Sequence, residues 1–219
     1  MRTADTQFVS SEHGLSESGA VKRELILAVS SELFADRGYS ASTMRQLAER
    51  AGLPLGNVYY YFSSKYDLLV AIIDNSMSGL QENAQAIVGG GGRPTERLAA
   101  LAVHHVDVHL ANPHAARVAD RELRSLSPDD RERIVARRDK YEQCFRQVLS
   151  EGIELGEFSS GTAIPFASAA IITMCSGIID WWSPNGAVDR QQSAEILSRY
   201  AVQIVGGRLA SAHGEDSVF

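Results

Sequence analysis

Three consecutive tyrosines, Tyr59, Tyr60 and Tyr61, are followed closely by Lys65, and this combination suits contact with nucleic acid. Tyrosine hydroxyls donate hydrogen bonds to phosphate oxygens, and tyrosine rings pack on thymine methyl groups. A lysine at the beginning of a helix places its cation beside free backbone N–H groups, which also bind phosphate. We therefore expect one tyrosine to pack inward while the others face a DNA backbone.

Four histidines, His104, His105, His109 and His114, form a second group with possible chemistry. His105 and His109 have the i,i+4 spacing of a metal-binding pair on a helix. No carboxylate or thiol at ligand spacing completes the set, because Asp107 falls on another face. We expect these histidines to line a pocket or pack in the core, and a metal site is the alternative.

Signatures of an enzyme are missing from the sequence. The glycine run at 89–92 lacks the Lys-Ser/Thr that completes a phosphate-binding loop, and no Gly-x-Ser-x-Gly motif is present. Cys144 and Cys175 are too few for a disulfide framework or a four-ligand zinc site. We expect no enzymatic activity and no cofactor.

The charge is distributed unevenly along the 219 residues, which carry a net charge of −6. Residues 19–66 contain six Lys/Arg and four Asp/Glu, whereas the rest of the chain carries a net charge of −8. A mildly basic head on an acidic body fits a protein in which only the head meets a polyanion.

The elements that position these residues are predicted to be helices throughout, since apolar residues recur at helical spacing and no hairpin turn separates alternating runs. The fold class is therefore all-α, with about nine helices expected at residues 21–37, 44–51, 54–61, 65–88, 95–110, 114–125, 128–155, 163–182 and 190–210. We divide the chain into a disordered tail (1–18), a DNA-binding head (19–66), a larger body (67–211) and a flexible C-terminus (212–219).

The stretch 43–62 reads as a helix-turn-helix, two short helices joined by a turn that contains glycine. Ala48 falls where the helices cross, and Gly52 supplies the left-handed conformation of the turn. The outward face of the second helix consists of Pro54, Leu55, Gly56, Asn57, Tyr59 and Tyr60.

Neither export nor membrane insertion is predicted. The first eighteen residues have no apolar core of a signal peptide, so we expect a cytoplasmic protein. Residues 158–179 carry no charge, but Gly161 and Pro165 interrupt them, and we expect a helix buried on several sides.

Residues 22–74 resemble the N-terminal domain of the TetR family of transcriptional regulators. The motifs FADRGY (34–39), TMRQLAERAG (43–52) and GNVYYYFSSK (56–65) carry the resemblance. It implies three DNA-binding helices, a helical body that binds a small molecule, and a homodimer on a palindromic operator in double-stranded DNA. This chain departs from the usual pattern with Pro54, Leu55 and Tyr60, where small polar residues and histidine are common.

The DNA-binding residues expected on these grounds comprise phosphate contacts and residues that lie near the bases. The first group is Thr43, Tyr59, Tyr60 and Lys65; the second is Leu55, Gly56 and Asn57; Arg45 and Pro54 complete the surface. The alternative is a helical protein-interaction module that does not bind DNA.

In the body we expect an apolar pocket and a dimer surface. The pocket is predicted to be lined by Leu101, Val108, Phe145, Leu149, Met174 and Trp181, with His105 and Arg121 orienting the ligand. The last two helices are predicted to form the dimer interface, with Ala167, Ala170 and Ile178 in it. The segments 181–186 and 203–207 are similar to TetR regulators of fatty-acid and steroid catabolism, which implies a repressor released by a hydrophobic metabolite such as an acyl-CoA.

Overall fold

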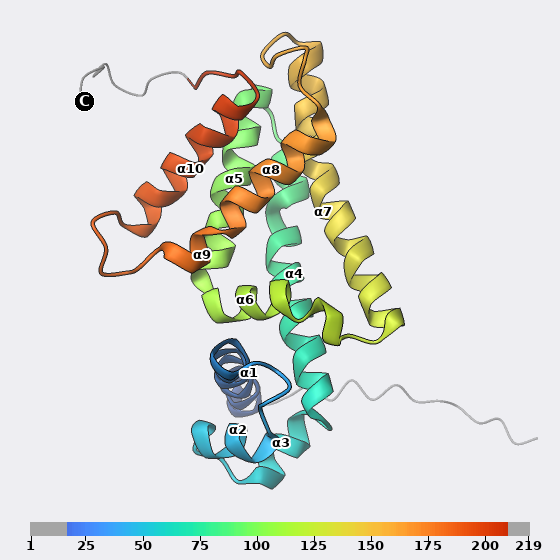
Figure 1. Ribbon diagram of the computed structural model, residues 1–219, viewed down its shortest axis with the longest axis vertical. Helices are drawn as coiled ribbons and strands as arrows, with labels where there is room; N and C mark the ends of the chain where they lie inside the picture. The colour runs from blue at the N-terminus through green and yellow to red at the C-terminus, as the bar shows by residue number, and fades with distance from the viewer. Residues whose placement is uncertain (1–16, 210–219) are drawn as a thin grey trace, which may run out of the picture.

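The computed structural model describes residues 17–209, and within this range the chain is helical without strands (Figure 1). The helices are α1 (Glu17–Arg37), α2 (Met44–Ala51), α3 (Leu55–Tyr61), α4 (Lys65–Gly89), α5 (Pro94–Ala111), α6 (Pro113–Arg121), α7 (Pro128–Glu154), α8 (Ile164–Ser176), α9 (Ile178–Trp181) and α10 (Arg190–Ile204), with a 3-10 turn η1 (Leu123–Ser125). The predicted all-α fold is confirmed. The expected tails, 1–18 and 212–219, lie outside the described residues except for residues 17 and 18, which belong to α1.

The head consists of α1, α2 and α3, packed at one end of the molecule (Figure 1). Its core is built from buried apolar side chains of all three helices and the residue that follows them: Ile26, Leu33, Phe34, Leu47, Ala48, Val58 and Phe62. The small Ala48 lies in this core as the crossing of α2 and α3 requires.

Local signals set the ends of the short helices. Thr43 caps α2 by accepting a hydrogen bond from the Gln46 backbone N–H, and the Gln46 side-chain oxygen accepts one from the Thr43 N–H. Gly52 ends α2 with φ +64°, a left-handed conformation that glycine adopts without steric cost. Ser64 caps α4 through the Asp67 N–H. The caps at Thr43 and Gly52 explain why the predicted and observed bounds of α2 agree.

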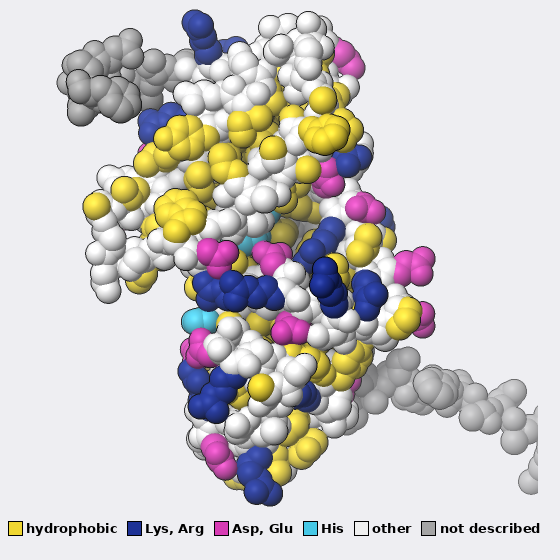
Figure 2. Space-filling view, in the orientation of Figure 1, with side chains coloured by type: hydrophobic (Ala, Val, Ile, Leu, Met, Phe, Trp, Pro, Cys, Tyr) yellow, Lys and Arg dark blue, Asp and Glu magenta, His cyan; other side chains and the backbone are white. Residues whose placement is uncertain are grey.

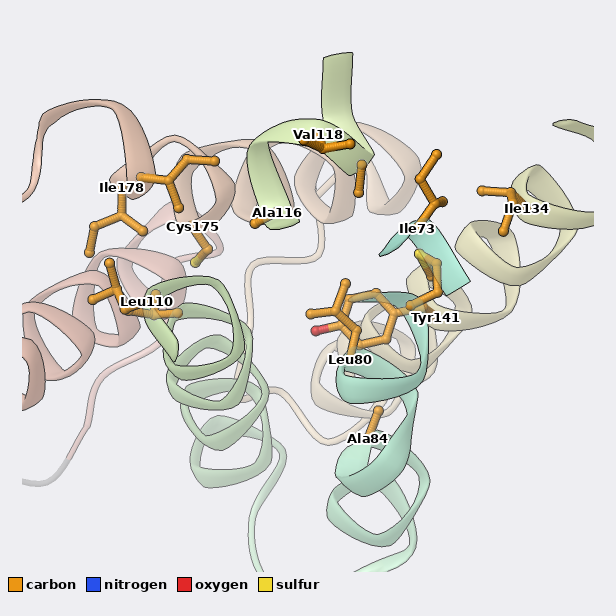
Figure 3. Packing of buried hydrophobic residues seen from close by; sticks show 14 of the residues in the cluster. Ile73, Leu80, Ala84, Leu110, Ala116, Val118, Ile134, Tyr141, Cys175 and Ile178 are labelled. Atoms are coloured by element: carbon orange, nitrogen blue, oxygen red, sulfur yellow. The ribbon is translucent and has the colours of Figure 1, made fainter. Parts of the chain in front are cut away.

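The long helix α4 leaves the head and continues into the body, where it packs against α5, α6 and α7 (Figure 1). Its buried residues Leu69, Ile73, Leu80 and Val88 follow one face along almost its whole length. Figure 3 shows side chains of α4, α5, α6, α7, α8 and α9 meeting in one core. The helix α4 therefore connects the head directly to the centre of the body.

Two predicted helices in the C-terminal part are too long. The one expected at 163–182 is interrupted at Gly177, which separates α8 from α9 and has the lowest helix propensity apart from proline. The one expected at 190–210 ends at Ile204, because Gly206 adopts φ +74°. A Cβ on Gly207 would lie 3.0 Å from Phe158, so the chain turns there in close contact with the α7–α8 loop.

Residues Ile164–Trp181 are long and apolar enough to meet the length and hydropathy of one membrane span, with a mean hydropathy of 1.5. In the structure this segment is α8 and α9, and α8 packs against α5, α7 and α10. One such segment is weak support for a membrane span, because core helices of globular proteins share its composition.

Candidate nucleic-acid interface and internal cavity

The three tyrosines of α3 are divided between surface and core. Tyr60 is 73% exposed and Tyr59 is 48% exposed, whereas Tyr61 is half-buried against the head core. The Tyr60 and Tyr61 rings meet edge to face, with centroids 5.0 Å apart. Two phenol groups are therefore available on one face of α3, next to the fully buried Val58.

The first turn of α3 presents little side-chain bulk. Pro54, Gly56 and Asn57 are exposed, and Leu55 is half-buried because it packs against the head core. Only the carboxamide of Asn57 offers hydrogen bonds at this end of the helix, since the other three side chains carry no polar group. A close approach of this turn to another surface meets no steric obstacle.

Thr43 and Arg45 lie exposed at the start of α2. The Thr43 hydroxyl is occupied by its cap, accepting from the Gln46 N–H at 3.3 Å and donating to the Gln46 side chain at 3.1 Å. Arg50 at the other end of α2 pairs with Glu32 and Asp36 of α1, so its charge is neutralised within the head.

Lys65 has partners inside the head. Its Nζ donates to the backbone carbonyl oxygens of Tyr39 and Ser42, both at 2.8 Å, and to that of Ser40 at 3.4 Å. The ammonium also lies 4.4 Å from the centre of the Tyr39 ring. The structure therefore contradicts the expected contact of Lys65 with phosphate, because all three ammonium donors point to the loop between α1 and α2 and fix this loop against α4.

The head is joined to the body by polar contacts as well as by α4. The Tyr66 hydroxyl donates to Asp130 at 2.6 Å and accepts from the Ser127 N–H, at the start of α7. The Tyr39 N–H donates to Glu122, directly after α6. Displacement of α6 or α7 in the body would therefore reach the head through these bonds.

A cavity of about 250 Å³ lies within the body, between α4, α5, α6, α7 and α8. Its lining residues are Ser76, Met77, Leu80, His105, His109, Ala116, Ala119, Asp120, Arg138, Tyr141, Glu142, Ala169, Ile172, Thr173 and Ser176. Figure 3 shows Leu80 and Tyr141, both lining residues, projecting from α4 and α7. On the surface, Figure 2 shows histidine at the base of a hollow edged by acidic and basic side chains.

His105 is the most buried polar residue of this cavity, with 1% of its surface exposed. Its Nδ1 lies 3.0 Å from the Tyr141 hydroxyl and its Nε2 lies 2.9 Å from the Ser176 hydroxyl. Burial lowers the pKa of His105 well below its usual range, and the charges of His109 and His104 lower this pKa further. The imidazole is therefore neutral at pH 7.

The other histidines do not converge with His105 on a metal site. The His109 ring stacks on His105 at 4.2 Å, with Nδ1 facing the His105 carbonyl oxygen, and His104 Nε2 faces the Leu80 carbonyl oxygen. His114 lies at the start of α6. Over residues 17–209, no group of three His, Cys, Asp or Glu side chains is arranged to hold a metal ion.

Of the residues predicted to line a pocket, His105 is the one that lines this cavity. Leu101, Phe145 and Leu149 fill the core, Val108 lines a smaller cavity of about 150 Å³ between α1, α4, α5 and α6, and Met174 is half-buried elsewhere on α8. Trp181 is 64% exposed, and Arg121 lies on the surface beside Asp180. These predictions are corrected, because helix packing turns those side chains to other faces.

The cavity is nevertheless bordered by α5, α7 and α8, which carry most of the predicted pocket residues, together with α4 and α6. The sequence carried a signal for the missed residues: Arg138, Tyr141 and Glu142 share one face of α7 at i, i+3 and i+4 spacing. Ile172 and Ser176 have the same relation on α8.

The surface of α8 and α10 exposes large apolar side chains. Phe166 of α8 is 81% exposed, Tyr200 and Ile204 are exposed on α10, and Trp181 is exposed on the neighbouring α9. Figure 2 shows hydrophobic side chains gathered over this part of the molecule. Such a patch marks an interaction surface in most proteins of known structure.

The residues predicted for the dimer interface differ in their exposure. Ala170 is exposed on α8, in an open groove between α8 and α10 that Ala167 also lines. Ile178 is fully buried in the core, where a second copy of the chain cannot reach it, so its predicted place in the dimer interface is wrong.

Two family models match the chain. Residues 26–72 match the "Bacterial regulatory proteins, tetR family" model, and residues 91–205 match the "Tetracyclin repressor-like, C-terminal domain" model. The chain belongs to the TetR family of transcriptional regulators. The resemblance seen in the head motifs is thereby confirmed, and the second match extends it to the body.

Relatives of similar length agree with this assignment. The chain is 26% identical to the transcriptional repressor KstR2 of Mycobacterium tuberculosis, covering 85% of this chain and 92% of the relative. It is 24% identical to the fatty acid metabolism regulator protein of Bacillus subtilis, covering 82% and 91%. These TetR-family relatives are transcriptional regulators and not enzymes.

Among solved structures, a tetR-family regulatory protein from Rhodococcus RHA1 is 27% identical, with a TM-score of 0.77. The alignment covers 85% of this chain and 98% of that one. The arrangement of a small head on a larger helical body is therefore that of TetR regulators.

Proposed function

We propose that this TetR regulator is a cytoplasmic repressor that binds a palindromic operator as a homodimer and is released by a hydrophobic small molecule. The observation that carries the proposal is the exposed face of α3, which offers two phenols and one carboxamide around a glycine turn. A body cavity bordered by α4, the helix that enters the head, supplies the means of control.

In the proposed complex α3 enters the major groove. Asn57 lies nearest the base edges, with Leu55, Gly56 and Pro54 beside it, because this turn is exposed and unobstructed. Tyr59 and Tyr60, with Arg45 of α2 and its N-cap residue Thr43, contact phosphates on either side of the groove, and Thr43 would exchange its hydrogen bond to the Gln46 side chain for one to phosphate. Lys65 acts indirectly, by holding the α1–α2 loop against α4.

The proposed dimer pairs α8 and α10 with their symmetry mates in a four-helix bundle. Phe166, Tyr200 and Ile204 are large apolar residues that a second copy would cover. Ala170 and Ala167, in the groove between the helices, would allow close approach. A two-fold dimer requires an operator with two related half-sites.

The proposed effector occupies the cavity and shifts α4 and α6, which carry the change to the head. A ligand alters DNA affinity only through a difference in its own affinity for the two states. The names of the relatives, a repressor called KstR2 and a fatty acid metabolism regulator, favour a lipid-derived compound such as an acyl-CoA thioester. The mostly apolar cavity lining agrees with that class.

In vitro selection from a random duplex pool tests the DNA-binding proposal. We expect a palindromic motif whose affinity falls steeply with salt. Asn57→Ala should relax discrimination at one position of each half-site, whereas Tyr59→Ala should weaken binding to all sequences. Gln143→Ala, exposed on α7 away from the head, is the control. A helical protein-interaction module would enrich no motif and show no salt-dependent DNA binding.

Sedimentation tests the dimer. Phe166→Asp should give monomers with weakened operator binding, because it places a charge in the centre of the apolar patch. Val135→Asp, an exposed apolar residue of α7, should leave the dimer intact. A monomeric unmodified protein would contradict the proposed interface.

A thermal-shift screen of metabolites, acyl-CoA thioesters included, identifies candidates for the effector. Each compound that stabilises the protein is then tested for release of the selected operator. A ligand that binds the folded state raises the unfolding temperature, and at equal ligand concentration the tighter ligand raises it more, so the compounds can be ranked by affinity.

A further inference from the structure

Three hydrogen-bonding side chains from three helices meet at the wall of the cavity. His105 of α5 lies between Tyr141 of α7 and Ser176 of α8, with both ring nitrogens at hydrogen-bond distance from a hydroxyl. We call His105, Tyr141 and Ser176 the polar trio. All three residues line the cavity.

Within the polar trio, one hydroxyl O–H has no acceptor. A neutral imidazole has one N–H donor and one bare nitrogen acceptor. One hydroxyl therefore donates to the ring, while the other accepts from the ring and keeps its own hydrogen for another partner. This holds for either tautomer of His105, and only the identity of the free O–H, Tyr141 or Ser176, changes.

The charged groups at the cavity are already paired. Among the described lining residues, Arg138 is the one Lys or Arg, and it lies 3.5 Å from Asp120 and donates to the Ala119 carbonyl oxygen. Glu142 pairs with Arg146 at 2.8 Å and accepts from Ser168. An anion entering the cavity would lose its water and find no free cation, which is costly.

Apart from Ser76, His109 and Thr173, the remaining lining residues are apolar, and the cavity is limited in size. Met77, Leu80, Ala116, Ala169 and Ile172 supply much of the wall. An engineered cavity of about 150 Å³ holds one benzene molecule, so in proportion 250 Å³ takes about ten non-hydrogen atoms.

We infer that the part of the effector inside the cavity is an uncharged apolar chain or ring that carries one neutral oxygen acceptor, a carbonyl or ester-type oxygen, bound by the free O–H of the polar trio. A compound that presents an ionised carboxylate there is rejected. This inference rests on the proposed function for its biological meaning, but its physical content concerns binding to the cavity alone.

Three probes with equal numbers of non-hydrogen atoms test the inference: octanamide, 2-nonanone and octanoate. Calorimetric titration of the full chain at pH 7.5, without DNA, should show both neutral probes binding at least roughly tenfold more tightly than octanoate, because only octanoate brings a charge. Octanoate binding equally or more tightly than octanamide would overturn the inference, and so would no binding of any probe.

A variant locates the binding. His105→Leu combined with Tyr141→Phe and Ser176→Ala removes the polar trio while keeping similar volumes, and it should weaken octanamide and 2-nonanone by roughly tenfold. Ser193→Ala, which removes a buried hydroxyl from α10, is the matched control and should leave all affinities unchanged. Unchanged octanamide affinity in a folded triple variant would overturn the role of the polar trio. If the triple variant does not fold, the probe series on the unmodified chain still decides.

Failure of this inference and failure of the proposed function are separable. A chain that prefers octanamide but binds no operator refutes the proposed repressor and keeps the cavity chemistry. A chain that binds its operator but prefers octanoate keeps the proposed repressor and refutes the cavity chemistry.

Discussion

Replacing His105 by glutamine should change how the stability of this regulator depends on pH. The folded chain holds the His105 ring neutral, because burial and the neighbouring His109 and His104 lower its pKa well below its usual range. The groups around the ring are His104 and His109 on α5, Tyr141 on α7 and Ser176 on α8, with Asp120, Arg138 and Glu142 at the same cavity.

The magnitude follows from proton linkage. In the unfolded chain a histidine titrates near pH 6.5, so below that pH the unfolded state binds a proton that the folded state does not. Stability therefore rises with pH through this window and falls as pH is lowered. From pH 6.5 to 5.5, with His105 neutral in the fold, this one group removes about 1 kcal/mol from the free energy of unfolding.

Urea denaturation at fixed protein concentration measures the effect, since the stability of the proposed dimer would depend on concentration. The loss between pH 6.5 and 5.5 should be about 1 kcal/mol smaller for His105→Gln than for the unmodified chain. His109 has a lowered pKa, chiefly through burial, and is present in both proteins, so the difference reports His105. Between pH 7.5 and 8.5 the two pH dependences should coincide. Equal losses in the acidic window would refute the neutral buried imidazole.

Three further variants test the head and the core. Gly52→Ala should lower stability by about 1–2 kcal/mol, because alanine is strained in the left-handed conformation of this residue. Gly56→Ala in the helix α3 should not lower stability, and no atom crowds the added Cβ at either position, so the difference reports backbone conformation alone. Equal effects of the two substitutions in urea denaturation would contradict this. Lys65→Met should lower stability by about 1–3 kcal/mol by leaving loop carbonyls without their donor; unchanged stability with uniformly weaker DNA binding would place Lys65 on a phosphate instead. Phe145→Ala should cost about 3–5 kcal/mol because the ring is fully buried, and a loss below 1 kcal/mol would show that the core collapses around it.

The sequence predicted those elements whose ends are fixed by local signals. Thr43 and Gly52 bound α2 through a cap and a left-handed turn, and both signals are readable from neighbouring residues. The end of α10 at Gly206 and Gly207 involves contact with the distant residues Ser159 and Phe158, which no local pattern contains. Gly177 is a local signal, but one glycine does not by itself predict where a long apolar helix breaks.

The site was predictable to a similar degree. The outward tyrosines follow from helical spacing within α3, and His105, which was expected at a pocket, lines the cavity of the body. Lys65 and Trp181 were placed incorrectly, because the partner of a long side chain depends on which helix packs beside it. The remaining cavity residues, including Tyr141 and Ser176, depend on the relative rotation of α5, α7 and α8.

The coupling between effector and operator is the most direct test of a ligand-controlled repressor. Fluorescence anisotropy gives the affinity for the selected operator with and without the thioester that most raises the unfolding temperature. Calorimetry gives the affinity for that thioester with and without operator. We expect each ligand to weaken binding of the other by the same factor, because coupling free energy is reciprocal. A thioester that binds the protein tightly yet leaves operator affinity unchanged would contradict it.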